Sequence, residues 1–226
     1  MKKLLSLLSL LLLLAVNNVR ATEPYADRFY INRIFSALNL AENGLNREVF
    51  NLAIKGWDKL SMSGKLHNSD IVTIADYSQS SNKKRLYVID LKNMKLLFNT
   101  YVAHGRNTGD EFARSFSNKE GSLKSSLGFY VTENPIIGSH TGFSLMISGV
   151  EKGINDNAEK RAIIMHAADY ATEDFIRKYG RLGRSLGCPA VPPEFNQLII
   201  EAIKGGTCLF LYNPDKNYLS SSSLLN

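Results

Sequence analysis

The sequence predicts a mainly β domain, a sandwich or barrel, with a helical hairpin before it and one helix near its end. Two observations support this fold class. About seven short segments rich in β-branched and aromatic residues follow one another from residue 70 onward, separated by polar connections. These segments do not alternate with helical patterns, which argues against a doubly wound parallel sheet.

The first residues have the pattern of an export signal. Lys2 and Lys3 precede a 13-residue run, 4–16, that is apolar apart from serines, and Val19-Arg-Ala21 offers small residues to a signal peptidase. A membrane-spanning helix needs about 20 residues, so an uncleaved anchor is the less favoured alternative. We expect a signal peptide at 1–21 cleaved after Ala21, a periplasmic or secreted protein, and no stable membrane anchor after cleavage.

The charge expected for the mature chain gives no indication of nucleic-acid binding. The signal holds three basic residues and no acidic one, so its removal lowers the formal charge from +6 to +3. This excess is too small to indicate nucleic-acid binding, and it does not repel an anionic polymer such as a cell wall.

Residues 22–66 are expected to form the helical segment. Asn43-Gly44 separates two groups of apolar residues at helical spacing: Ile31, Ile34, Phe35 and Leu38, then Val49, Leu52, Ala53, Trp57 and Leu60.

Residues 67–213 are expected to form the β domain. The strands are predicted at 71–77, 85–91, 96–102, 127–132, 143–148, 162–165 and 207–212. A polar Lys92-Asn93 turn indicates that the second and third form a hairpin.

Two helices and a tail complete the organisation. Pro193 suits a first helical turn and Gly205 a stop, with an apolar face formed by Phe195, Leu198, Ile199, Ala202 and Ile203. Thr172 is expected to cap a short helix through Tyr179. Residues 214–226 are expected to be a flexible tail.

His166 and Cys188 are the candidate catalytic residues. Arg161-Ala-Ile-Ile-Met-His166 reads as a buried strand that ends in a histidine, and Cys188 lies in a turn between Gly187 and Pro189. An imidazole can take the proton of a thiol, and the resulting thiolate attacks carbonyl carbons.

These features resemble the YkuD-type L,D-transpeptidases, exported bacterial enzymes that act on peptidoglycan stem peptides. The resemblance extends over residues 27–213 and identifies a divergent branch with a Ser185-Leu-Gly-Cys-Pro189 motif. It rests on four further segments: Val102-Ala-His-Gly-Arg-Asn107, Ser125-Ser-Leu-Gly-Phe-Tyr130, Gly153-Ile-Asn-Asp156 and Gly206-Thr-Cys-Leu-Phe-Leu-Tyr212.

The resemblance implies a fold, a reaction and partners. It implies the YkuD-like β fold, with Cys188 as nucleophile, His166 as proton acceptor and peptidoglycan stem peptides as substrates. A thioester would form as D-alanine leaves a tetrapeptide stem, and the amine of a second stem would resolve it to a 3→3 cross-link. It also implies acylation by carbapenem-type β-lactams.

Two other functions stay open. Water in place of the amine would make the protein an L,D-carboxypeptidase, or an amidase that detaches wall-bound groups. A degenerate, non-catalytic peptidoglycan-binding protein is the third alternative, although such a module needs no activated thiol.

The turn around the cysteine supplies further candidate site residues. Backbone N–H groups near Gly187 and Cys188 are the expected oxyanion donors, and Ser185 is expected to orient either His166 or the turn. The motif departs from common family members, which place an arginine two residues after the cysteine, where this chain has Ala190. Arg184, and less favoured Arg181, are the substitutes we expect for binding a substrate carboxylate.

The remaining reactive side chains are expected to be structural. Cys208 is expected to be a buried apolar residue and not a disulfide partner of Cys188. We expect His104 to be a hydrogen-bonded structural histidine and His67 and His140 to lie in exposed loops. One histidine with one cysteine is too few ligands for zinc, and no nucleotide motif is present, so no metal and no cofactor are expected.

Overall fold

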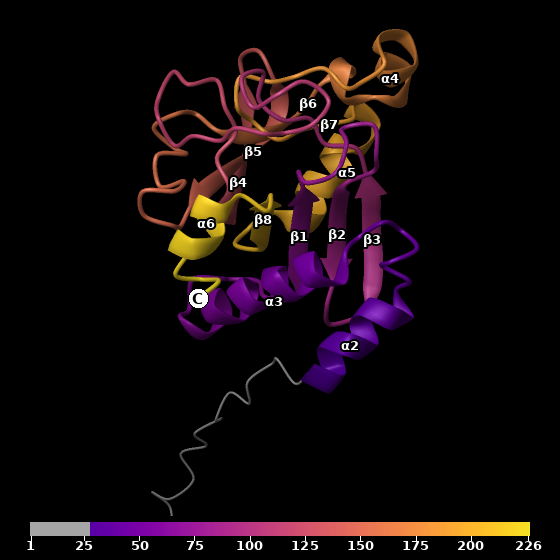
Figure 1. Cartoon of the computed structure of the whole chain (residues 1–226), viewed down its shortest axis with the longest axis vertical. Helices are drawn as coiled ribbons and strands as arrows, with labels where there is room; N and C mark the ends of the chain where they lie inside the picture. The colour runs from indigo at the N-terminus through magenta and orange to yellow at the C-terminus, as the bar shows by residue number, and fades with distance from the viewer. Residues whose placement is uncertain (1–27) are drawn as a thin grey trace, which may run out of the picture.

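Eight strands form one mixed sheet in the order β3-β2-β1-β8-β4-β5-β6-β7 (Figure 1). The computed structural model describes residues 28–226, so the predicted signal at 1–21 lies outside the described residues. The strands are β1 Ile71–Asp76, β2 Leu86–Asp90, β3 Lys95–Thr100, β4 Gly128–Gly138, β5 Gly142–Gly149, β6 Ile164–Ala167, β7 Ala190–Val191 and β8 Cys208–Tyr212. The mainly β prediction is confirmed.

A short contact outside the named strands brings the two edges of the sheet together. The chain leaves β3 at Thr100, and Ala103 then forms an antiparallel bridge with Ala190 of β7, the strand at the opposite edge. The sheet is therefore curled almost into a barrel, and the bridge lies beside the cysteine turn.

The predicted helical hairpin is present as α2 Arg28–Ala37 and α3 Arg47–Met62. Asn46 begins α3 by accepting a hydrogen bond from the backbone N–H of Glu48, as an N-cap residue does. Helix α3 contacts β1 and β8, and Figure 1 shows it lying across the lower end of the sheet. Its apolar face belongs to the same hydrophobic core as the strands.

The contact between α3 and the sheet depends on a glycine. A Cβ atom at Gly56 would lie 2.0 Å from Cζ of Phe129, whose ring stacks on Phe210 at a centroid distance of 4.1 Å. Both rings are fully buried, so neither can move aside. Gly56 lets the helix approach the stacked pair closely, at the cost of helix propensity.

Helix α5, Pro193–Ile203, follows the cysteine turn as predicted, but the face that it buries is rotated about the helix axis relative to the predicted apolar face. The buried residues are Asn196, Ile199, Ile200 and Ile203, whereas Leu198, expected in the core, is 58% exposed. Asn196 explains the rotation, because its side chain donates a hydrogen bond to the carbonyl of Phe143 in β5 at 2.7 Å.

The expectation of a flexible tail is wrong for the residues after 214. Lys216–Ser221 forms α6, capped by Asp215, which accepts a hydrogen bond from Tyr218 N. Ser222 donates to the buried carboxylate of Glu151, and Leu225 is buried. The serine-rich composition of this segment gives no sign of the Asp215 cap or of the buried Ser222 and Leu225. Figure 1 shows α6 and the C-terminus beside α3.

Three strands differ from the sequence prediction. β4 continues to Gly138, past a register shift between Thr132 and Pro135, because a bulge tolerates the proline. β6 starts at Ile164 and not at Ala162, whose φ of 52° is left-handed. β7 has only two residues and carries no periodic signal.

We expect Gly56→Ala to destabilise the fold, although alanine is the better helix former. The added methyl group must displace the stacked Phe129 and Phe210 rings, and overpacking of this kind costs about 1–3 kcal/mol. The free energy of unfolding from urea denaturation tests this. Asn51→Ala, on the exposed side of the same helix, is the control and should change stability by less than about 0.5 kcal/mol. A Gly56→Ala protein as stable as the control would contradict this packing.

Candidate active site

His166 lies inside β6, between β5 and β7, and the sheet determines where its ring points. It pairs with Ser144 on one side and with Ala190 on the other. Its side chain is 8% exposed, and its Nδ1 lies 2.9 Å from the carbonyl oxygen of Ala167. A carbonyl only accepts hydrogen bonds, so the proton is on Nδ1 and Nε2 is left as an acceptor.

The charge state of His166 follows from its burial. Burial lowers the pKa of the imidazole, and the hydrogen bond to Ala167 only partly opposes this effect. The ring is therefore neutral at physiological pH, which is the form that a proton acceptor requires.

The turn that carries Cys188 is shaped by Gly187 and Ser185. Gly187 has a φ of 131°, and a Cβ there would lie 2.9 Å from the carbonyl oxygen of Lys124. The Ser185 hydroxyl donates to the Cys188 carbonyl at 2.6 Å and accepts from the Gly187 N–H at 3.1 Å. Of the two roles expected for Ser185, the structure shows the one in the turn.

The segment from Ala103 to Arg106 supports this turn from behind. Ser185 N donates to the carbonyl of His104 at 3.0 Å, and Arg106 N donates to the carbonyl of Ser185 at 2.8 Å. Gly105 lies so close that a Cβ would be 3.0 Å from Cα of Gly187. The histidine-glycine motif noted in the sequence thus supports the cysteine turn.

His104 is structural, as expected. Its Nδ1 accepts a hydrogen bond from buried Arg85 at 2.8 Å, and its Nε2 lies 3.2 Å from the carbonyl of Gly109. Burial and the Arg85 charge lower the pKa of His104 to about 3, so it stays neutral. Arg85 also donates twice to the carbonyl of Val102, which ties the bracing segment to β2.

Cys188 and His166 line one cavity of about 550 Å³. Its walls come from the β4–β5 hairpin tip, the turn before β6, and the cysteine turn; the other lining residues are Gly138, Ser139, His140, Thr141, Arg161, Ala162, Ile163, Ile164, Tyr170, Arg184, Ser185 and Leu186. His140 is exposed, as expected, and so is His67.

The Cys188 thiol is neutral at rest. Among the described residues the Cys188 sulfur donates one hydrogen bond, to the carbonyl of Ala162 at 3.8 Å. It forms no hydrogen bond with His166. Burial raises the pKa of the thiol, against smaller lowering effects of the Ile164 backbone, Arg161 and its own backbone N–H. Cys208 is fully buried in β8, and both cysteines are free.

Arg184 lines the cavity, as we expected, but its charge is already partnered. Its guanidinium pairs with Asp110 and donates to the carbonyl of Gly109. Arg181 lies 3.9 Å from the same carboxylate and is not among the residues that line the cavity. A substrate carboxylate would therefore compete with Asp110 for Arg184.

Arg161 is the site residue that sequence reasoning missed. It is the first residue of the segment 161–166, in which a strand is predicted. A basic residue at that position suggests a side chain exposed to solvent at the end of the strand. The structure places it in a turn instead, with its side chain against the cavity. No local sequence pattern signals this, because its hydrogen-bond partners lie 35 to 44 residues away.

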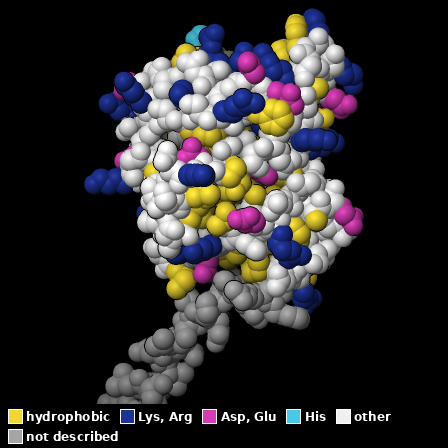
Figure 2. Space-filling view, in the orientation of Figure 1, with side chains coloured by type: hydrophobic (Ala, Val, Ile, Leu, Met, Phe, Trp, Pro, Cys, Tyr) yellow, Lys and Arg dark blue, Asp and Glu magenta, His cyan; other side chains and the backbone are white. Residues whose placement is uncertain are grey.

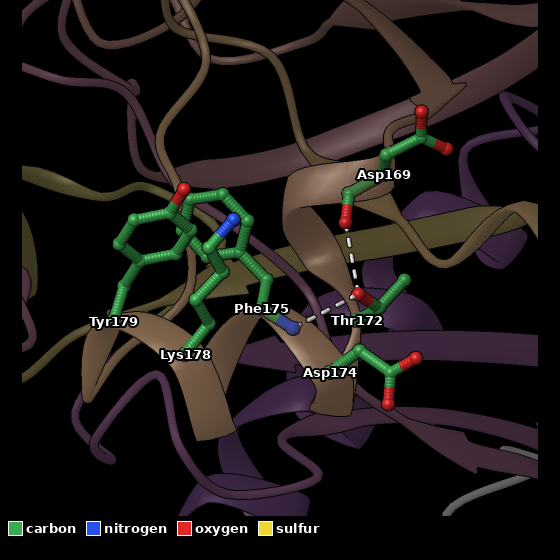
Figure 3. Close-up of a pocket in the computed structure, with 6 residues that line it drawn as sticks. All are labelled: Asp169, Thr172, Asp174, Phe175, Lys178 and Tyr179. Atoms are coloured by element: carbon green, nitrogen blue, oxygen red, sulfur yellow. Dashed lines mark hydrogen bonds between the residues drawn. The ribbon is translucent and has the colours of Figure 1, made fainter.

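A second cavity, of about 430 Å³, lies on the short helix α4, Glu173–Tyr179 (Figure 3). Thr172 caps this helix as predicted, accepting from Phe175 N at 3.3 Å. The lining residues are Asp169, Thr172, Asp174, Phe175, Lys178 and Tyr179, and neither His166 nor Cys188 is among them.

Across residues 28–226, no three His, Cys, Asp or Glu side chains gather closely enough to hold a metal ion. Of the helices within the same residues, none has the length and apolar character needed to cross a membrane.

The arrangement is suited to acyl transfer. A thiol and the free Nε2 of a neutral imidazole face one cavity, and a stiff turn and a sheet hold them. The imidazole can accept the thiol proton as the sulfur attacks a carbonyl carbon, and can return it to the leaving group.

Residues 41–212 match the sequence model of the L,D-transpeptidase catalytic domain. A search of curated proteins finds no significant match. Similar solved structures include an L,D-transpeptidase from Mycobacterium smegmatis (9% identity, 64% of this chain and 59% of that chain, TM-score 0.40). Another comes from Stackebrandtia nassauensis (12% identity, 81% and 76%, TM-score 0.39). The chain spans less than two thirds of the first, and at these TM-scores neither adds to the family match.

We expect iodoacetamide to label native protein once, at Cys188, because Cys208 is fully buried. Because its pKa is raised, Cys188 should ionise at a higher pH than an ordinary thiol, whose pKa is about 8.5. The alkylation rate should therefore rise with pH to a midpoint above that value. Intact mass against time at several pH values measures it.

Cys188→Ala and Cys208→Ala are the matched controls for this labelling. The first should take up no label in the folded protein, and the second should react like wild type. Labelling of Cys208 in native protein, or a midpoint well below 8, would contradict the described burial.

Proposed function

The chain belongs to the L,D-transpeptidase catalytic domain family, and we propose that it is an exported cysteine L,D-transpeptidase of peptidoglycan. In this proposal it acts on tetrapeptide stems through a Cys188 thioester and forms 3→3 cross-links. One observation carries the proposal: in a member of this family, Cys188 shares a cavity with an imidazole whose Nε2 is free to accept a proton.

The chemistry needs no preformed ion pair. As the Cys188 sulfur attacks the stem carbonyl, its proton passes to Nε2 of His166, and the carbonyl oxygen becomes an oxyanion. Collapse of this intermediate breaks the carbon–nitrogen bond, the imidazolium gives its proton to the D-alanine amine, and a thioester remains. A second stem's amine then attacks, loses its proton to His166, and releases Cys188 as a thiol.

The turn offers backbone donors for the oxyanion. The N–H of Gly187 is held by the Ser185 hydroxyl at rest, whereas the N–H of Cys188 faces its own sulfur. We assign the first donor role to the Cys188 N–H. The Gly187 N–H can serve only when it leaves Ser185. Each such donor is worth about 10²–10³ in rate.

The proposed location rests on the sequence of residues 1–21 and fits the surface. On the face shown in Figure 2, Lys and Arg side chains are spread among Asp and Glu and do not form one continuous basic patch. We assign the protein to the periplasm or the extracellular side, with peptidoglycan stem peptides as its substrates and Arg184 as one contact for a stem carboxylate.

Product analysis tests the proposal most broadly. Purified protein without residues 1–21 is mixed with defined disaccharide-tetrapeptides, and the products are identified by mass spectrometry. We expect a 3→3 dimer and free D-alanine from wild type and from Cys208→Ala. Cys188→Ala should give neither while staying close to the wild-type melting temperature, because the thiol lines a cavity and is only partly buried against the core.

The products also separate the alternatives. A tripeptide without dimer would show that water resolves the thioester, as in an L,D-carboxypeptidase. Binding without any product would indicate a peptidoglycan-binding protein. Product formation by Cys188→Ala would overturn the nucleophile assignment.

His166→Ala should slow acylation by about 10²–10⁴-fold near neutral pH, because the general base is lost. Raising the pH should partly restore the rate by ionising Cys188 directly, since the thiol pKa lies above its usual value. Acylation by tetrapeptide or a carbapenem against pH, with melting temperatures alongside, provides the measurement. A variant that acylates at the wild-type rate near pH 7 would remove His166 from this role.

A further inference from the structure

Arg161 is held against the nucleophile turn by neutral groups. Its Nη1 donates to the carbonyl of Ser117 at 2.8 Å and to the Ser126 hydroxyl at 3.1 Å. Its Nη2 donates to the Ser122 hydroxyl at 3.4 Å and to the carbonyl of Lys124. These bonds fix the guanidinium in place, and none of them neutralises its charge.

Within residues 28–226 no carboxylate lies at ion-pair distance from Arg161. The other arginine that lines the cavity, Arg184, is paired with Asp110, and the neighbouring Lys160 is paired with Glu120 at the surface. Arg161 is also half-buried, so solvent screens it less than an exposed cation. It is thus the unneutralised arginine among the described residues of the cavity wall.

The guanidinium lies next to the cysteine turn. Its Nη2 would be 3.3 Å from a Cβ atom at Gly187, the residue before Cys188. Two groups near the guanidinium would stabilise its positive charge if they lost a proton: the phenol of Tyr130 and the thiol of Cys188. Burial raises the pKa of Tyr130, so its phenol stays neutral. The Cys188 thiolate is therefore the anion with which Arg161 can interact.

We propose that Arg161 is a positioning residue whose fixed positive charge favours the negative charge that develops at the Cys188 sulfur. The proposal rests on the nucleophile role assigned to Cys188 above. His166 becomes positive only after it has taken the thiol proton, whereas the Arg161 charge is present before the reaction. A charge held by existing hydrogen bonds needs no reorganisation during attack.

The other titratable groups around the sulfur do not supply this charge. They are His166 from β6, Tyr170 from the 3-10 turn Asp169–Ala171, Arg184 from the cysteine turn, His140 from the hairpin tip, and Tyr77, which directly follows β1 and which burial keeps neutral. Burial keeps His166 and Tyr170 neutral, and Asp110 offsets Arg184. His140 is exposed to solvent.

The pH profile of iodoacetamide alkylation at Cys188 tests the proposal without any stem peptide. Arg161→Gln should raise the midpoint by about one pH unit, and so lower the rate about tenfold below the midpoint. Arg161→Lys keeps the charge and should stay within about 0.3 units of wild type. Lys160→Gln removes the same charge one residue away, where Glu120 and solvent already offset it, and should leave the midpoint unchanged.

The two Arg161 variants separate charge from scaffolding. Both lose part of the four-bond anchorage, so a purely structural role predicts equal shifts in Arg161→Gln and Arg161→Lys, and that result would overturn the proposal. An unchanged midpoint in Arg161→Gln, with or without weaker binding of a tetrapeptide, would overturn it too. Because alkylation reads the thiol alone, the result stands whether or not the protein makes cross-links.

Discussion

The geometry of the active site depends on the pairing of Ala190, two residues after the cysteine. Ala190 pairs in parallel with His166 of β6 and in antiparallel with Ala103, so one short strand fixes the cysteine turn relative to His166. Ala103 is held in turn because Arg85 binds the carbonyl of Val102 and the ring of His104. A buried arginine that binds carbonyls and a neutral histidine is costly to leave unpaired, which keeps this segment in place.

The electrostatics of the pair indicate how the proposed chemistry would begin. Burial raises the pKa of Cys188 and lowers that of His166, so both effects favour the neutral thiol and the neutral imidazole. The thiolate is therefore a minor form of resting Cys188 at physiological pH. In the proposed mechanism the proton moves when the sulfur attacks, and two groups then stabilise the new charges: the Cys188 N–H at the oxyanion and Arg161 at the sulfur.

Local patterns allowed much of this structure to be predicted. Helical spacing located α2 and α3, and β-branched runs located five of the eight strands closely. The strand-histidine and glycine-cysteine pattern pointed to His166 and Cys188, which line one cavity. Features that depend on distant contacts were missed. The rotated face of α5 follows from Asn196 reaching β5, the ordered tail from Glu151, and the place of Arg161 from carbonyls and hydroxyls of the 117–126 loop. β7 was missed because two residues between prolines are too few to show the alternation of apolar and polar residues that marks a strand.

The proposed reaction requires that Cys188 carries the acyl group of the substrate. The most direct measurement is the intact mass of the protein after brief mixing with a tetrapeptide stem, followed by peptide mapping of any adduct. We expect a transient mass increase equal to the stem minus D-alanine, located on the peptide that contains Cys188 and released by hydroxylamine, as a thioester is. An adduct on another residue, or turnover of the stem with no adduct on Cys188 at any time, would contradict it.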